Sequence, residues 1–183
     1  MIAVDTASDS AKALLRVTPE AIAGMVPSGD VGILTIDDVR SGYALLSDDV
    51  GVIDLVWIGC PHASLPEISR VAEMVKGQHL ALPLWITCAR PVRDLAVAQG
   101  LVDVIEAAGG SVFADACMAI APVRDLGFSA VATASAKGAY YLRNLAKVDA
   151  VFGDLEQCID AAVAGGWQKP RFTIDGSLAQ SVS

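Results

Sequence analysis

Short apolar runs alternate with segments of helical period along most of this chain. The runs are rich in β-branched side chains and stop at turn residues, a pattern typical of strands buried on both faces of a parallel sheet. The pattern predicts strands at 31–36, 53–58, 82–88, 111–115, 129–133 and 149–152.

Helical segments follow most of these runs. Thr18 and Ser64 are suitable N-caps, each followed by Pro in the first turn and by Glu. The spacing of apolar residues predicts helices over about 18–26, 37–46, 64–77, 91–110, 135–145 and 154–166. In the long helix over 91–110, the residues expected to face the core are Val92, Leu95, Ala96, Leu101 and Ile105.

Alternating strands and helices of this length indicate right-handed βαβ units. We therefore predict an α/β fold, a three-layer sandwich with a mostly parallel sheet covered on both faces. The expected organisation is a weakly patterned N-terminal segment (1–17), one α/β domain (18–166) and an irregular C-terminal tail (167–183).

Composition narrows the class of protein. A chain of 183 residues is long enough for one domain with a sizeable core. Its net charge of −8 argues against a nucleic-acid surface, which needs a clustered basic face. No apolar run approaches the roughly 20 residues of a membrane span, and the N-terminus lacks the pattern of a signal peptide. We expect a cytoplasmic protein whose four cysteines are reduced.

Cysteines occupy the ends of three predicted strands: Cys60, Cys88 and Cys117. Ligands of open parallel sheets bind beyond the carboxyl ends of the strands, so these thiols are expected to share one crevice. Thiolates bind iron–sulfur clusters, zinc or Cu(I), and isolated cysteines from separate strands favour iron–sulfur. Cys158 lies within a predicted helix, where a buried apolar role is expected.

Polar side chains accompany the cysteines. His62 follows Cys60 by two residues and can act as an acid–base group or orient a ligand. Arg90 can bind a carboxylate or phosphate through two parallel hydrogen bonds, and Asp115 is expected to anchor its turn by hydrogen bonding. Hydroxyls and a cation beside a helix N-terminus form an anion site, predicted here from Thr133, Ser135 and Lys137.

Three motifs follow one another along the chain: Ile58–Ser64 with Glu67, Ala114–Met118 with Ala121 and Pro122, and Thr133–Lys137. Together they resemble the aconitase X family. Their order and spacing resemble the later half of the catalytic large-subunit region of that family, over about residues 18–164. The chain departs from the family pattern at Ala116 and Ala134.

The resemblance implies an aconitase-like domain of an iron–sulfur hydro-lyase that removes water from a small hydroxy acid. It implies that Cys60 and Cys117 are metal ligands, with Cys88 as a candidate third ligand, for a [2Fe-2S] or [4Fe-4S] cluster or for iron. The implied catalytic residues are His62, Ser135 and Lys137. The implied substrate-binding residues are Arg90, Thr133 and Ser64.

The family draws a further cluster cysteine from a preceding N-terminal portion, and no cysteine precedes Cys60 here. We therefore expect a component that is active only with partner segments or a partner subunit. The expected activity is of the cis-3-hydroxy-L-proline dehydratase type, and the alternative is of the mevalonate 5-phosphate dehydratase type. A non-catalytic assembly or ligand-binding subunit, and a thiol-dependent enzyme that uses Cys60, are the other hypotheses.

Overall fold

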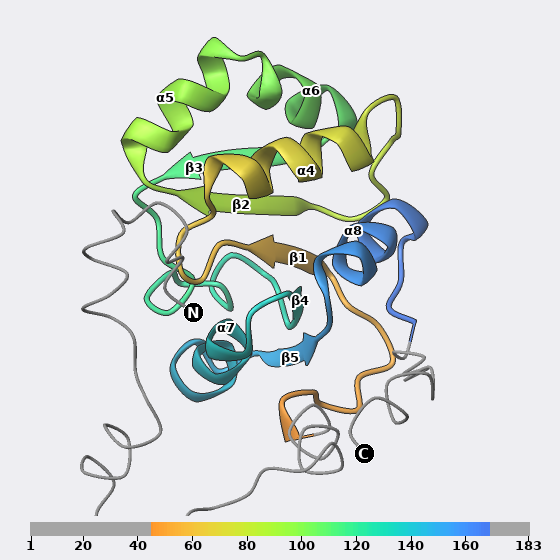
Figure 1. Ribbon diagram of the computed structural model, residues 1–183. Coiled ribbons are helices and arrows are strands. Elements are labelled where there is room, and N and C mark those ends of the chain that lie inside the picture. Colours follow the sequence, from red (N-terminus) through yellow and green to blue (C-terminus); the bar gives the residue numbers. More distant parts are fainter. Residues whose placement is uncertain (1–44, 169–183) are drawn as a thin grey trace, which may run out of the picture. The chain divides into compact units, whose positions relative to one another are not determined.

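Five parallel strands organise residues 45–168, the part of the chain that this computed structural model describes (Figure 1). The strand order is β3-β2-β1-β4-β5, and each pair of neighbours is parallel. The predicted α/β class with a parallel sheet is confirmed. The strands are β1 (Leu55–Ile58), β2 (Leu84–Cys88), β3 (Ser111–Ala114), β4 (Ala130–Thr133) and β5 (Asp149–Phe152).

Several predicted elements lie outside the described residues. They are the helix at 18–26, the strand at 31–36 and most of the helix at 37–46. The segment 1–17 and nearly all of the tail at 167–183 lie outside as well, so the predicted domain boundaries stay predictions.

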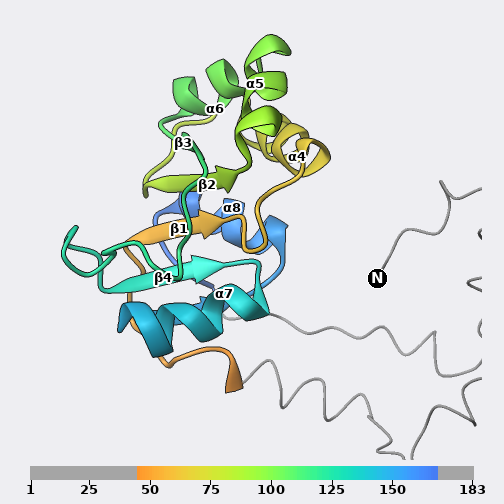
Figure 2. The same cartoon turned by 90° about the vertical axis from the view of Figure 1, so that its left-hand side faces the viewer.

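Helices cover both faces of the sheet, as Figures 1 and 2 show from two directions. On one face, alternate strand residues such as Val56 and Ile86 join a core with α4 (Leu65–Val75), α6 (Leu101–Ala108) and α8 (Leu155–Ala164). On the other face, Leu55 and Trp57 pack against α7 (Ala136–Tyr141), against the π-helical turn η2 (Leu142–Ala146) that continues it, and against Met118 and Val123 of a loop. Successive side chains of a strand point to opposite faces of the sheet. Because these strands are apolar on both faces, each face must be covered by a layer of helices or loops.

The prediction of a single long helix over 91–110 is wrong. The structure has two helices, α5 (Arg90–Ala98) and α6, because Gly100 adopts a left-handed conformation with φ 72° and ends the helical path. Leu95, expected to face the core, is 52% exposed, whereas Ala96 and Ile105 are fully buried.

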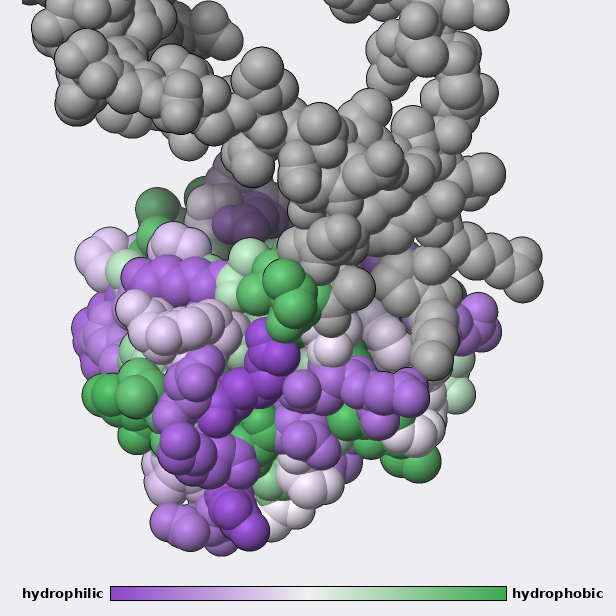
Figure 3. Space-filling model, turned by 90° about the horizontal axis from the view of Figure 1, so that it is seen from below, coloured by the Kyte–Doolittle hydropathy of each residue, from purple (hydrophilic) through white to green (hydrophobic). Residues whose placement is uncertain are grey.

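The surface seen from below in Figure 3 mixes hydrophilic and hydrophobic residues over the described part of that face. Within residues 45–168, no helix is both long and apolar enough to cross a membrane.

The carboxylate of Asp54 ties the start of β1 to the start of β4. It accepts hydrogen bonds from the Ser129 amide (2.8 Å), the Ser129 hydroxyl (2.7 Å) and the Ala130 amide (3.1 Å). The Asp54 amide in turn donates to the Ala130 carbonyl at 2.9 Å. These bonds fix the register between the two strands on which the candidate site is built.

Asp54→Asn replaces one acceptor oxygen with a donor that faces N–H and O–H groups. We expect it to lower the free energy of unfolding by about 1–3 kcal/mol, the usual cost of losing charge-assisted hydrogen bonds. Urea denaturation of the full chain measures this change. Glu106→Gln, at an exposed position of α6, is the matched control and should change stability by less than about 0.5 kcal/mol. Equal stability of the two variants would contradict the role of Asp54.

Candidate functional site

The strand order reverses between β1 and β4. The chain moves outward from β1 through β2 to β3, and then returns to the other side of β1 to form β4 and β5. Open α/β sheets bind ligands beyond the carboxyl ends of strands at such a reversal. A cavity of about 370 Å³ lies at this place, lined by Ile58–His62 and Glu67 on the β1 side and by Ala134 and Ser135 on the β4 side.

The Cys60 turn, defined here as Gly59–Ala63, leaves the end of β1 in a tightly held conformation. Gly59 has a φ of 113°, and a Cβ at this position would meet the Thr87 carbonyl oxygen at 2.2 Å. Only glycine fits this contact. The Cys60–Pro61 peptide bond is cis, and the Ala63 amide returns to the sheet by donating to the Thr87 carbonyl at 2.8 Å.

Ser135 joins the end of β4 to this turn. Its hydroxyl donates to the Cys60 carbonyl and accepts from the Gly138 amide at 2.8 Å, so that Ser135 is the N-cap of α7. The one hydrogen of this hydroxyl is therefore engaged with Cys60. In this structure Ser135, predicted to be catalytic, holds the backbone of the Cys60 turn.

His62 connects the Cys60 turn to residues 115–117, which follow the end of β3 and are called here the Cys117 turn. Its Nε2 lies 2.8 Å from the carbonyl oxygen of Ala116, the residue before Cys117. Because a carbonyl only accepts, Nε2 carries the hydrogen, and Nδ1 is the ring nitrogen left for other chemistry. His62 and Ala116 are 54 residues apart in sequence, so this bond brings together two distant segments that each contain a cysteine.

Asp115 anchors the same turn, as predicted. Its φ of 58° is left-handed, its amide donates to the Cys88 carbonyl at 2.8 Å, and its carboxylate accepts from the Arg90 amide at 3.0 Å. The second carboxylate oxygen lies 3.0 Å from an Arg90 guanidinium nitrogen. Arg90, predicted to bind substrate, is thus paired with Asp115 while both side chains stay largely exposed.

The three strand-end cysteines do not converge as expected. Cys60 is partly exposed beside the core that contains Trp57, and Cys117 is exposed. Cys88 is fully buried in the other core, and its thiol donates to the Phe113 carbonyl at 3.8 Å. The side chain of Cys88 points to the face of the sheet that α4 and α6 cover, and its predicted role as a third metal ligand stays a prediction. Cys158 is fully buried in α8, in the apolar position that its helical context predicts.

The remaining predicted residues have different surroundings. Ser64 is the N-cap of α4, where its hydroxyl forms a capping box with Glu67. Thr133 is fully buried, and its Oγ1 has no hydrogen-bond partner among residues 45–168. Lys137 is exposed, and its Nζ lies 5.6 Å from the centroid of the Tyr141 ring. Their predicted contacts with substrate stay predictions.

Burial raises the pKa of the Cys60 thiol, because a thiolate is poorly solvated there. The positive charge of Lys137 acts in the opposite direction, and the nearby Cys117 adds to the rise. Burial likewise raises the pKa of Cys88. A thiol-dependent enzyme needs a depressed pKa at its nucleophile, so these surroundings do not favour that hypothesis.

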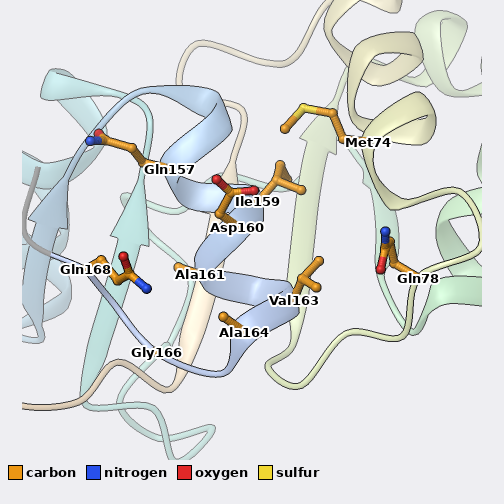
Figure 4. Close-up of a pocket in the computed structure, with 10 residues that line it drawn as sticks. All are labelled: Met74, Gln78, Gln157, Ile159, Asp160, Ala161, Val163, Ala164, Gly166 and Gln168. Carbon is orange, nitrogen blue, oxygen red and sulfur yellow. The ribbon is translucent and has the colours of Figure 1, made fainter. Parts of the chain in front are cut away.

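A second hollow, of about 540 Å³, lies along α8 and the end of α4, away from the strand ends (Figure 4). Its polar side chains are three glutamines and one carboxylate: Gln78, Gln157, Gln168 and Asp160. Among residues 45–168, no thiol, imidazole or basic side chain lines it. The smaller cavity at the ends of β1 and β4 is the better candidate, because reactive groups from separate strands meet there.

Thiol, imidazole and hydroxyl groups lie at the strand reversal of this doubly wound α/β domain, the place where open α/β sheets bind ligands. A family model described as the third domain of aconitase X matches residues 53–164. The chain belongs to the aconitase X family, which confirms the resemblance drawn from its motifs.

Relatives and a solved structure agree with this membership. The phosphomevalonate dehydratase large subunit of Methanocaldococcus jannaschii is 39% identical over 124 residues, covering 68% of this chain and 31% of that subunit. The cis-3-hydroxy-L-proline dehydratase of Hypocrea jecorina is 33% identical over 163 residues, covering 83% of this chain and 27% of that enzyme. The crystal structure of Thermococcus kodakaraensis aconitase X in its holo-form superposes with a TM-score of 0.65 at 34% identity, covering 74% of this chain and 36% of that one. The chain thus spans about a third of the length of the relatives that it matches.

Sequence reasoning missed Thr87, a buried residue whose main-chain and side-chain oxygens both contact the Cys60 turn. A polar residue next to a strand-end cysteine, within an otherwise apolar run, is the signal that could have found it.

Gly59→Ala should destabilise the chain, since a Cβ would collide with the main chain of β2 and the left-handed φ disfavours alanine. We expect a loss of about 2–5 kcal/mol in the free energy of unfolding, measured by urea denaturation. Gly51→Ala is the control, because nothing lies within 4 Å of a Cβ there and the backbone is not left-handed. A Gly59→Ala variant as stable as Gly51→Ala would show that the turn is not held against Thr87.

Alkylation of Cys60 by iodoacetamide should be slow at neutral pH and should accelerate as the pH rises toward its raised pKa. Burial favours the protonated thiol, so the reactive thiolate accumulates only in alkaline solution. Mass spectrometry of the Cys60 peptide gives the rate at each pH, and an unstructured cysteine peptide is the reference. A Cys60 rate that has already reached its plateau at neutral pH would support the thiol-enzyme hypothesis instead.

Proposed function

We propose that this chain provides the third domain of an aconitase X hydro-lyase that removes water from a small hydroxy acid. The observation that carries the proposal is the hydrogen bond from His62 to Ala116, which joins the Cys60 and Cys117 turns at the reversal of strand order. Family membership supports the same reaction class.

The donor set fits an iron site in part. Two soft thiols, Cys60 and Cys117, lie on turns that His62 joins, and thiolates are ligands that iron–sulfur centres select. No group of three or more His, Cys, Asp or Glu that could hold a metal occurs among residues 45–168. We therefore assign Cys60 and Cys117 as two ligands, and propose that the other ligands come from outside the described residues rather than from Cys88.

Bound iron would act as a Lewis acid toward the hydroxyl that leaves the substrate. The side chains of this domain have separate tasks around it. His62 keeps Nε2–H on Ala116, which leaves Nδ1 as the ring atom able to take up or give a proton. Lys137, whose charge already acts on Cys60, is proposed to attract the anionic group of the substrate. Ser135 fixes the turn that carries Cys60.

The relatives favour a phosphorylated substrate. Two phosphomevalonate dehydratase large subunits are each 39% identical to this chain, and others are 35%, 31% and 27% identical. The cis-3-hydroxy-L-proline dehydratases are 33% and 35% identical. We therefore propose mevalonate 5-phosphate as the substrate, in place of the hydroxyproline expected first from the motifs.

The description of these relatives as large subunits supports a partner subunit for this chain as well.

The metal assignment is tested on the full chain assembled with its partner subunit under anaerobic conditions. We expect iron in the wild-type complex. In Cys60→Ser and Cys117→Ser we expect the affinity for iron to fall by at least about tenfold. Cys88→Ala is the matched control and should retain iron. An iron content that Cys60→Ser leaves unchanged would contradict the assignment, and a stable, metal-free wild-type complex would favour a non-catalytic subunit.

The substrate assignment is tested by supplying the same complex with mevalonate 5-phosphate and with cis-3-hydroxy-L-proline in parallel. We expect dehydration of the phosphorylated acid and a loss of at least about tenfold in kcat/KM on Lys137→Ala, because a charged contact to the substrate is removed. Lys147→Ala removes a cation of a loop outside the cavity and is the control. Turnover of hydroxyproline alone would contradict the assignment.

A further inference from the structure

We infer that Thr87 is the positioning residue of the site: its buried hydroxyl and its carbonyl hold the Cys60 turn at both ends. Thr87 lies near the end of β2 and is fully buried. Its neighbour Cys88 points to the opposite face of the sheet, so Thr87 is the β2 residue that faces the turn.

The Thr87 hydroxyl both donates and accepts hydrogen bonds. Its Oγ1 donates toward the Gly59 carbonyl at 3.0 Å, with the Ile58 carbonyl at 3.4 Å as a weaker second acceptor. The same oxygen accepts a hydrogen bond from Trp57 Nε1 at 3.2 Å. One hydroxyl thus satisfies a buried indole N–H and the carbonyl that immediately precedes Cys60.

The Thr87 main chain holds the other end of the turn. Its carbonyl accepts from the Ala63 amide at 2.8 Å. Residues 60–62, which include the proposed metal ligand and His62, therefore lie between two attachment points on a single residue of β2. Because Gly59 has no side chain, the turn can approach Thr87 closely enough for both bonds to form.

The Trp57 side chain that bonds Thr87 belongs to a cluster of aromatic rings. The Trp57 ring packs edge-on against Trp85, with centroids 5.3 Å apart, and Trp85 packs in the same manner against Phe113 and Phe128. Trp57 is 2% exposed, so its N–H has no access to bulk water as an alternative partner. Through its hydrogen bonds, the Thr87 hydroxyl connects this buried cluster to the Cys60 turn.

This inference rests on the proposed function only in taking Cys60 to be a metal ligand. The hold of Thr87 on the Cys60 turn can be tested without metal. The full chain, freed of metal by a chelator, is treated with iodoacetamide at alkaline pH, and mass spectrometry gives the alkylation rates of Cys60 and Cys117 in one sample. Thr87→Val keeps the shape of the side chain and removes the hydroxyl. We expect the Cys60 rate to rise about fivefold, the effect of one lost hydrogen bond on opening of the turn, with the Cys117 rate changed less than twofold, roughly.

Two further variants separate positioning from general stability. Thr87→Ser restores the hydroxyl and should return the Cys60 rate to that of the wild type, although it leaves a small cavity. Ile105→Val lowers stability from α6, in the other core, and should leave the rate unchanged. A Cys60 rate that Thr87→Val does not raise, or that Ile105→Val raises equally, would overturn the inference. Absence of iron or of dehydratase activity would instead count against the proposed function and leave the alkylation result standing.

Discussion

The contact between Gly59 and Thr87 is the constraint on which the candidate site depends. The main chain of the Cys60 turn approaches β2 so closely that any side chain at residue 59 would collide with the Thr87 carbonyl. That closeness allows the hydroxyl and carbonyl of Thr87 to bond residues on both sides of Cys60. His62 then extends the fixed turn to the Cys117 segment through Ala116, and Ser135 attaches it to β4. One close approach between two strands therefore orders a site that draws on three separate parts of the chain.

The strand order explains why the site lies at the end of β1. Because the chain proceeds to β2 on one side of β1 and returns to β4 on the other, α4 and α7 leave the sheet on opposite faces and a cavity opens between their starts. Partial burial in this cavity disfavours the Cys60 thiolate, while Lys137 favours it. A cysteine must lose its proton to bind a metal, and the charge of Lys137 offsets only part of the cost of burying the resulting thiolate. A bound metal ion would supply further positive charge beside the Cys60 sulfur.

The sequence was sufficient to predict the parallel α/β class and the five strands within the described residues, because short β-branched runs between helical segments are a strong signal. Gly100 shows where periodicity misled: apolar residues recur at helical spacing on both of its sides, but its left-handed φ divides the helix. Cys88 shows a second limit. Its alternation with Leu84 and Ile86 already places it in the buried core under α4 and α6, whereas its proximity to a strand end suggested the crevice. Thr87 was missed because its role depends on long-range contacts with a turn 28 residues earlier, which no local pattern encodes.

The proposed site requires that Cys60 and Cys117, far apart in sequence, form one pair of thiols at the strand reversal. A trivalent arsenical such as phenylarsine oxide bridges two thiols only when they lie close together, so its binding to the metal-free full chain is a decisive measurement. We expect one arsenic per chain, bridging Cys60 and Cys117, and loss of the adduct in either single serine variant. An adduct that includes Cys88, or no bridged adduct in the folded wild-type chain, would contradict it.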